Sequence, residues 1–284
     1  TDLKRGDRHL PRIDLNCDLG ESFGVYHLGA DREIMTYVTS ANIACGFHAG
    51  DPSVMRRTVE MAAECGAAIG AHPGLPDLPG FGRRELRVTA REAEDLIVYQ
   101  IGALDAFARA SGAKLSHVKP HGALYNMIAR DVNLARAAAA AVRAVDPGLL
   151  LYLPVASAAV QVAMELGLTV IEEGFADRTY LPDGNLTPRS KEGALVSDPA
   201  EAGRRAVLMA MEGKALCADG AVIALRPGTI CIHGDQANAA DFARAVAGAL
   251  NAAGITIQSP APALASKSAS TSKSTSTQAS AAKS

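Results

Sequence analysis

A strictly alternating segment near the N-terminus constrains the fold of this chain more than any other feature. Over residues 13–21, IDLNCDLGE, apolar positions alternate with Asp14, Asn16 and Asp18, which is the periodicity of a β-strand. Several later strands are instead apolar runs, as in parallel sheets that helices cover on both faces. If the first strand belongs to such a sheet, its polar side chains point into a closed interior. Burying a carboxylate without partners is costly, so we expect other strands to supply partners.

Strands and helices alternate along most of the chain, which predicts successive βα units and a mainly parallel sheet. Polar residues follow nearly every strand instead of gathering at one crevice, and no GxGxxG follows a strand. Both features favour a seven-stranded parallel β/α barrel over a doubly wound open sheet. We predict the seven strands at residues 13–21, 42–47, 68–71, 115–118, 149–155, 168–173 and 229–232, with a hairpin at 214–225 and an edge strand at 255–257. We predict helices at residues 30–38, 51–65, 89–110, 131–145, 158–166 and 238–252, and a further helix starting at 198.

The composition indicates one domain with polar extensions. Residues 11–258 form the predicted barrel, residues 1–10 a flexible lead-in, and residues 259–284 a disordered tail, because a Ser/Ala/Thr/Lys segment buries too little apolar surface to offset its ordering entropy. The net charge of −2 gives no reason to expect binding to nucleic acid or to an anionic membrane. No apolar run approaches the roughly 20 residues that span a bilayer.

The N-terminal segment and the cysteines bear on localisation. The first residues lack the apolar core of a signal peptide, although the absence of a starting Met leaves an already removed leader open. The five cysteines are widely spaced, and we interpret Cys45, Cys65 and Cys231 as small buried residues of a protein from a reducing compartment. We therefore expect a cytoplasmic protein.

Titratable side chains recur at the predicted strand ends. His48 and His72 follow the second and third strands, Lys119 and His121 follow the fourth, and His233 follows the seventh. Counting by twos places these residues on the faces that carry polar or small side chains, opposite the aliphatic faces. Histidine is scarce and titrates near neutral pH, so this recurrence predicts a shared polar cavity.

Some of these residues also have simpler structural interpretations. Asp51 precedes Pro52 at the start of a helix, which favours a helix cap over a catalyst. Asp235 could cap the last helix or line the site. His117 lies deep in its strand and is interpreted as a hydrogen-bonded core residue, and His27 as an exposed loop residue.

The carboxylates near the predicted rim allow the same two interpretations. Asp18 with Glu21, and Glu173 with Asp177 and Arg178, could belong to the site or anchor loops through salt bridges. The motifs GxxxxGK[ST], HExxH and GxSxG are absent, so the sequence predicts no P-loop, no zincin site and no nucleophile elbow. The absence of Trp and the 4% aromatic content argue against a long sugar-binding cleft.

Six ordered segments resemble the LamB/YcsF family, the A subunit of prokaryotic ATP-dependent 5-oxoprolinase. They are IDLNCDLGESFG, ANIACGFHAGDP, AHPGLPDLPGFGRR, HVKPHGALYN, EEGFADRTYLPDGNLTPRS and ICIHGD, and the similarity spans residues 13–254. The resemblance implies a β/α barrel of the glycoside hydrolase/deacetylase type. It also implies cleavage of 5-oxo-L-proline to L-glutamate with ATP hydrolysis, together with partner subunits B and C, which would bind most of the ATP.

We assign roles within this resemblance as hypotheses. Asp18, His72 or Glu173 would act as general base, and Arg178 would pair with the substrate carboxylate. Lys119, His121 and His233 would stabilise developing oxyanion charge. The candidate catalytic residues are Asp18, His72, Lys119, His121 and Glu173, and the candidate substrate-binding residues are Asn16, His48, Arg178, His233 and Asp235.

Two other interpretations remain open. The chain could be a metal-dependent hydrolase or deacetylase that acts alone, because Asp18, His48, His72 and His121 could form a zinc-type site. It could also be a subunit without catalytic residues that presents the substrate to its partners.

Overall fold

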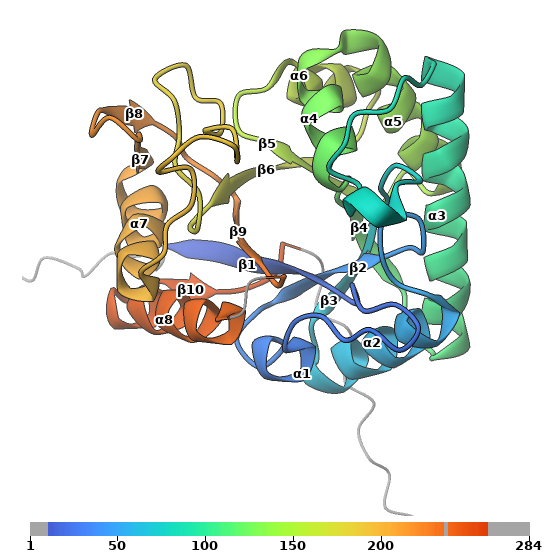
Figure 1. The fold of residues 1–284 in the computed structure, drawn as a ribbon, viewed down its shortest axis with the longest axis horizontal. Coiled ribbons are helices and arrows are strands. Elements are labelled where there is room, and N and C mark those ends of the chain that lie inside the picture. Colours follow the sequence, from blue (N-terminus) through green and yellow to red (C-terminus); the bar gives the residue numbers. More distant parts are fainter. Residues whose placement is uncertain (1–10, 236–237, 261–284) are drawn as a thin grey trace, which may run out of the picture.

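Seven parallel strands close into a barrel (Figure 1). The computed structural model describes residues 11–235 and 238–260. Strand β1 pairs with β2 on one side and with β9 on the other, which closes the ring and confirms the barrel over the open sheet. The barrel strands are β1 Arg12–Leu19, β2 Ser40–Ala44, β3 Ala68–His72, β4 Leu115–Val118, β5 Leu150–Pro154, β6 Val170–Phe175 and β9 Thr229–His233. Outside the ring, β10 (Thr256–Ile257) pairs with β1, and β7 (Lys214–Leu216) with β8 (Val222–Ala224) forms the predicted hairpin.

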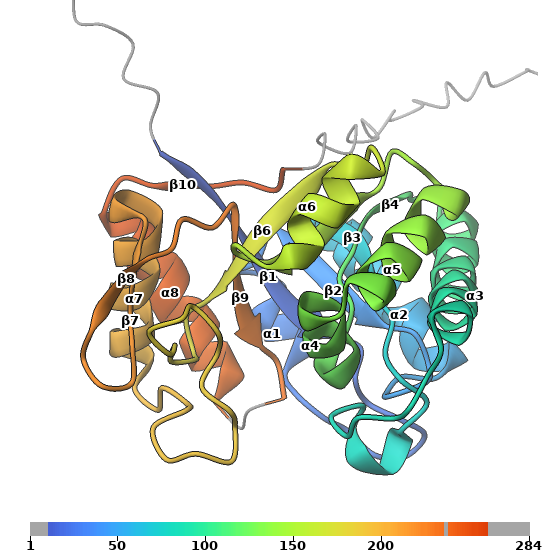
Figure 2. The same ribbon diagram turned by 90° about the horizontal axis from the view of Figure 1, so that it is seen from above.

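The helices form an outer layer around the strands, as the two perpendicular views show (Figures 1 and 2). Within the described residues, no helix combines the length and the apolar character that crossing a membrane would need. The helices are α1 Asp31–Ile34, α2 Pro52–Cys65, α3 Ala90–Ala110, α4 Gly122–Arg130, α5 Val132–Val145, α6 Ala158–Glu165, α7 Pro199–Glu212 and α8 Ala239–Ala252, with a 3₁₀ turn at Leu78–Gly80.

The residues that the sequence predicts to cap the starts of helices α2 and α3 do cap them. Asp51 accepts hydrogen bonds from the backbone N–H groups of Ser53 and Val54 and caps α2, which confirms its interpretation as a helix cap. Thr89 and Glu92 form a reciprocal capping box at the start of α3. These caps fix where the helices begin, and so they fix the lengths of the loops above the strand ends.

Apolar and polar side chains alternate along β1, so that they lie on opposite faces of the strand. Leu15, Cys17 and Leu19 are fully buried in the apolar layer between the strands and the helices. Asp14 and Asn16 are also buried, but they point into the barrel, where polar groups of other strands contact them. The polar interior that the alternation predicts is therefore present.

The structure departs from the sequence-based expectations at three points. Helix α4 was not predicted, because its N-cap residue, His121, is not one of the residue types that signal the start of a helix. The helix predicted at residues 30–38 shortens to the single turn α1. Cys65 is exposed at the end of α2, so its interpretation as a buried residue was wrong. The predicted lead-in, 1–10, and all of the predicted tail after residue 260 lie outside the described residues.

Candidate functional site

The carboxylate of Asp14 lies at the bottom of the barrel interior, and both of its oxygens accept hydrogen bonds. Oδ1 of Asp14 accepts hydrogen bonds from the hydroxyls of Thr39 (2.7 Å) and Ser40 (2.8 Å). Its Oδ2 accepts from the hydroxyls of Tyr152 (2.9 Å) and Thr229 (2.6 Å). Burial raises the pKa of Asp14, and these four hydrogen bonds oppose that rise. We therefore interpret Asp14 and its four hydroxyl partners as a bottom layer that stabilises the fold.

Lys119 occupies the middle of the interior. Its Nζ lies 2.9 Å from Asp18 Oδ1 and 2.9 Å from Glu173 Oε1, and it donates to Asn16 Oδ1 at 3.2 Å and to Cys231 Sγ at 2.9 Å. The ammonium group is thus held between two buried carboxylates that come from β1 and β6. A buried lysine that is paired in this way stays charged in the folded protein.

Hydrogen bonds from neighbouring side chains hold the carboxylates of Asp18 and Glu173 in place. Glu173 accepts from the Asn16 amide at 3.0 Å and from the Tyr125 hydroxyl at 2.6 Å. Asp18 accepts from the Asn42 amide at 2.8 Å. Burial opposes ionisation of Asp18, but its interactions with His72 and Lys119 outweigh that effect and hold the pKa of Asp18 well below its usual range.

Small residues on β3 make room for this network. Gly70 lies opposite His117, and a Cβ atom at Gly70 would lie 2.0 Å from His117 Nε2. His117 therefore reaches Asn42 Oδ1 at 2.8 Å and stacks on Tyr152. This geometry confirms its interpretation as a hydrogen-bonded core residue, and burial lowers the pKa of His117 to about 3.

Three histidines and Glu21 form a buried group at the carboxyl ends of β1–β4; we call Glu21, His48, His72 and His121 the histidine cluster. Nε2 of His72 lies 2.9 Å from Nδ1 of His121 and 3.3 Å from Asp18 Oδ2. The ring of His48 stacks on that of His121 with a centroid distance of 3.7 Å. Glu21 Oε1 lies 3.5 Å from Nε2 of His48.

The loop between β3 and α3 packs against the histidine cluster. Phe81 accepts a hydrogen bond at its backbone oxygen from His121 Nε2 at 2.8 Å. Gly82 has φ +63°, and a Cβ atom there would lie 2.6 Å from His48 Cβ. Only glycine at position 82 lets the loop approach the imidazoles this closely. The loop covers His121, which is only 3% exposed.

Charged residues at the rim pair across neighbouring loops. Arg83 forms an ion pair with Asp235 at 2.6 Å, so Asp235 contacts the β3–α3 loop. His233 Nδ1 lies 2.8 Å from Asp177 Oδ2. Arg178 donates to the backbone carbonyls of Thr187 and Ala194.

Most of the predicted site residues converge in this interior. Asp18, His72, Lys119 and His121 are linked by contacts of 2.7–3.3 Å that run from the middle of the barrel to its mouth. Arg178 is the exception, because its guanidinium binds loop carbonyls. The remaining predicted residues lie in the same interior or at its rim, namely Asn16, His48, Glu173, His233 and Asp235.

Three functional candidates were missed or undervalued in the sequence. Glu21 takes the place of Asp18 in the set around the three histidines, whereas Asp18 contacts His72 at 3.3 Å and also binds Lys119 and Asn42. Tyr125 follows His121 by four residues, a helical spacing that was not recognised because α4 was not predicted. Cys231 is buried, as predicted, but it also contacts Lys119, which its position among apolar neighbours did not indicate.

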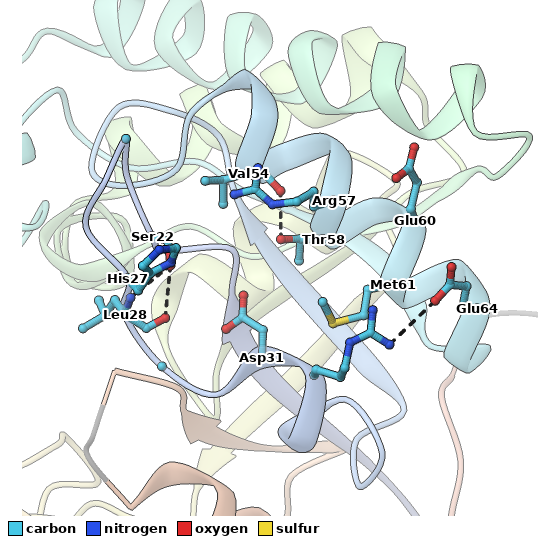
Figure 3. A pocket seen from close by; sticks show the side chains of 13 residues that line it. Ser22, His27, Leu28, Asp31, Val54, Arg57, Thr58, Glu60, Met61 and Glu64 are labelled. Carbon is cyan, nitrogen blue, oxygen red and sulfur yellow. Dashed lines mark hydrogen bonds and ion pairs between the residues drawn. The ribbon is translucent and has the colours of Figure 1, made fainter.

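A cavity lies outside the barrel (Figure 3). It is a cavity of about 500 Å³ between the β1–α1 loop and α2. Its lining includes Asp31, which accepts from the Gly20 N–H, and Arg32, which lies 4.0 Å from Glu64. None of the predicted site residues lines it, so it is separate from the barrel interior.

The comparison with known proteins decides the family. The profile described as the LamB/YcsF family matches residues 13–265. The chain belongs to the LamB/YcsF family. It is 55% identical over 248 residues to the 5-oxoprolinase A subunit of Heliobacterium modesticaldum, covering 87% of this chain and 98% of the relative. The Bacillus subtilis protein of the same name is 55% identical over 246 residues, covering 87% of this chain and 96% of the relative.

A solved structure supports the same assignment. The lactam utilization protein from Thermus thermophilus superposes with a TM-score of 0.83 at 49% identity, covering 87% of this chain and 99% of that chain. The matched part of this chain covers 96–99% of the length of these three relatives.

Proposed function

We propose that this chain is the A subunit of a 5-oxoprolinase and holds the site at which 5-oxo-L-proline is opened to L-glutamate. The observation that carries the proposal is the 55% identity over 98% of a relative named as the A subunit of 5-oxoprolinase. The proposal includes coupling to ATP hydrolysis and assembly with partner subunits B and C. It places the complex in the cytoplasm, where ATP is available.

The barrel interior suits a small cyclic amide. It offers an ammonium group, carboxylates and imidazoles within a few ångströms of one another. Opening a resonance-stabilised amide requires charge stabilisation at the carbonyl oxygen and a base for the attacking water. In this proposal ATP phosphorylates the amide oxygen, and partner subunits bind most of the nucleotide.

The contacts refine the roles of the candidate residues. The Asp18–His72 pair is the better candidate for the general base, because histidine is the side chain that most often serves as one and His72 Nε2 lies 3.3 Å from Asp18 Oδ2. Lys119, with His121 and His233, stabilises negative charge on the oxygen. Arg83 replaces Arg178 as the partner of the substrate carboxylate, since Arg83 is at the rim and its side chain is 32% exposed.

The test is a reconstituted assay of 5-oxoproline-dependent ATP hydrolysis. The chain is assayed alone, with both presumed partners, and with each partner omitted. We expect turnover only in the complete mixture, and we expect Asp18→Asn to reduce it at least about 100-fold, the scale of a lost general base. Asp95→Asn, at an exposed position of α3, is the matched control. Full turnover with Asp18→Asn would remove Asp18 from the mechanism, and full turnover without this chain would refute the proposal.

A second candidate function has one observation in its favour. The histidine cluster would suit a metal-dependent hydrolase or deacetylase that acts alone. Hydrolysis of 5-oxoproline or of an acetylated substrate by the metal-loaded chain, without ATP and without partners, would support this alternative. A substrate-presenting role would instead leave the complex active when Asp18, His72 and Glu173 are replaced one at a time.

A further inference from the structure

The histidine cluster contains more hydrogen-bond acceptors than its surroundings can satisfy. Its four members lie at or just after the carboxyl ends of four consecutive strands, and none is more than 6% exposed. In the described part of the chain, Glu21 Oε1 and both ring nitrogens of His48 have no hydrogen-bond partner. Buried polar atoms without partners are rare in folded proteins, so each one requires an explanation.

Backbone carbonyls fix the tautomers of the other two histidines. Nδ1 of His72 lies 2.7 Å from the carbonyl oxygen of Lys119, and Nε2 of His121 lies 2.8 Å from that of Phe81. A carbonyl oxygen only accepts, so both of these nitrogens carry hydrogen. The remaining nitrogens, His72 Nε2 and His121 Nδ1, bear lone pairs in the neutral rings and face each other at 2.9 Å.

Two facing lone pairs repel unless a cation lies beside them. A single proton shared by His72 and His121 would relieve that one contact. It would leave the nitrogens of His48 and the carboxylate oxygen of Glu21 buried without partners among the described residues. An ion that takes several ligands gives a partner to Glu21 Oε1, to one ring nitrogen of His48 and to the facing nitrogens of His72 and His121 at once.

We propose that Glu21, His48, His72 and His121 bind a divalent transition-metal ion, with Zn²⁺ as the best match. Three imidazole nitrogens and one carboxylate oxygen are a donor set that zinc favours, whereas Mg²⁺ and Ca²⁺ favour oxygen ligands. Bonds of about 2.0–2.1 Å in a tetrahedron separate the ligand atoms by about 3.3 Å. Three of the separations between ligand atoms, at 2.9, 3.5 and 3.7 Å, surround that value, and all of these atoms lie within 4.8 Å of one another.

The hydrogen bonds outside the histidine cluster also fit metal ligands. A histidine that binds a metal almost always donates its second ring N–H to a carbonyl or a carboxylate, which orients the ring. His72 and His121 both do so, through Lys119 and Phe81. With His72 held as a ligand, the proton-accepting role in the Asp18–His72 pair passes to Asp18. The metal site itself does not depend on the proposed 5-oxoprolinase activity.

The first test measures metal binding by the whole chain. The protein is treated with a chelator, dialysed, and titrated separately with Zn²⁺ and with Co²⁺ as a spectroscopic probe. We expect one ion per chain, visible Co²⁺ absorption typical of four-coordinate nitrogen and oxygen ligands, and a higher unfolding temperature with metal than with chelator. Less than about a tenth of an equivalent of bound Zn²⁺ would overturn the proposal.

Variants locate the ion. His48→Ala and Glu21→Gln should each weaken Zn²⁺ binding at least about 100-fold, because each removes a ligand. His27→Ala, which removes an exposed histidine, is the matched control and should bind Zn²⁺ as the unmodified chain does. Unchanged affinity in His48→Ala would overturn the proposal.

The Co²⁺ spectrum of the unmodified chain does not depend on the folding of any variant. Asp18, Cys231 and His233 form a second group whose ligand atoms also lie close together. A sulfur-to-cobalt charge-transfer band would place the ion at Cys231 and overturn the assignment to the histidine cluster. Absence of that band, with one bound ion, would support it.

Discussion

The bottom of the barrel and its mouth bury similar polar groups but satisfy them differently. Asp14 at the bottom receives four hydrogen bonds from hydroxyl groups. Glu21 at the mouth is similarly buried, but its Oε1 receives none within the described residues. Burial together with the charge of Asp18 raises the pKa of Glu21 well above its usual range.

This difference separates structure from function within one interior. A carboxylate with all its partners stabilises the fold, whereas one without partners weakens it unless a ligand completes it. Lys119 lies between the two regions, because it pairs with Asp18 and Glu173 below the histidine cluster. The comparison predicts how stability responds to substitution at each level.

The largest loss of stability should follow replacement of Lys119. Lys119→Met leaves Asp18 and Glu173 buried without their shared cation, so we expect a loss of about 3–5 kcal/mol in the free energy of unfolding. Turnover of the reconstituted complex should also fall in Lys119→Met. Urea unfolding measures the first effect, and Lys114→Met, at an exposed lysine of the same segment, is the control. A loss below about 1 kcal/mol would show that the pair of carboxylates is not held by this ammonium group.

Asp14→Asn should cost about 3 kcal/mol, since hydrogen bonds to a charged acceptor contribute about 1.5–3 kcal/mol each and an amide can accept through only one oxygen. The turnover of the folded fraction should stay within about twofold, because Asp14 lies below the proposed catalytic groups. Urea unfolding and the reconstituted assay measure the two effects. A large loss of turnover without a loss of stability would contradict the structural role of the bottom layer.

His117 should lower the free energy of unfolding as the solution becomes acidic. Its folded pKa of about 3 lies below its value of about 6.5 in an unfolded chain, so the unfolded state binds a proton that the folded state excludes. Its contribution is complete above about pH 6.5 and is lost as the pH falls toward 3, by about 1.4 kcal/mol per pH unit. His117→Gln should reduce this slope by that amount in urea unfolding between pH 4 and 6. An identical slope in both proteins would contradict the lowered pKa.

The smallest change in stability is expected at the mouth. In the presence of chelator, Glu21→Gln should change the free energy of unfolding by less than about 1 kcal/mol, because Glu21 Oε1 has no hydrogen bond among the described residues for the substitution to break. Turnover should nevertheless fall at least about tenfold, because the ion that Glu21 helps to hold lies beside Asp18. A loss of stability as large as that of Asp14→Asn would show that the two carboxylates are equivalent and would remove the distinction between bottom and mouth.

The sequence determined the fold class and most elements. Alternation along β1, apolar runs in later strands and helix caps such as Asp51 and Thr89 are local signals, and local signals can be read from neighbouring residues. The polar face of β1 was also readable, because a strand places every second side chain on one side. Helix α4 could not be read in this way, since His121 at its N-cap is not a residue type that signals the start of a helix.

Tertiary structure decided which polar groups meet. Barrel closure through the β1–β9 pairing brings Asp18 opposite His233, although they lie near opposite ends of the described chain. Glu21 joined the histidines, Arg178 turned to loop carbonyls, and Cys231 reached Lys119, because loop paths and strand register fix these distances and no local pattern encodes them. The sequence alone determined that a polar interior would exist. Only the closed barrel decided which of its groups are satisfied and which are left to bind a ligand.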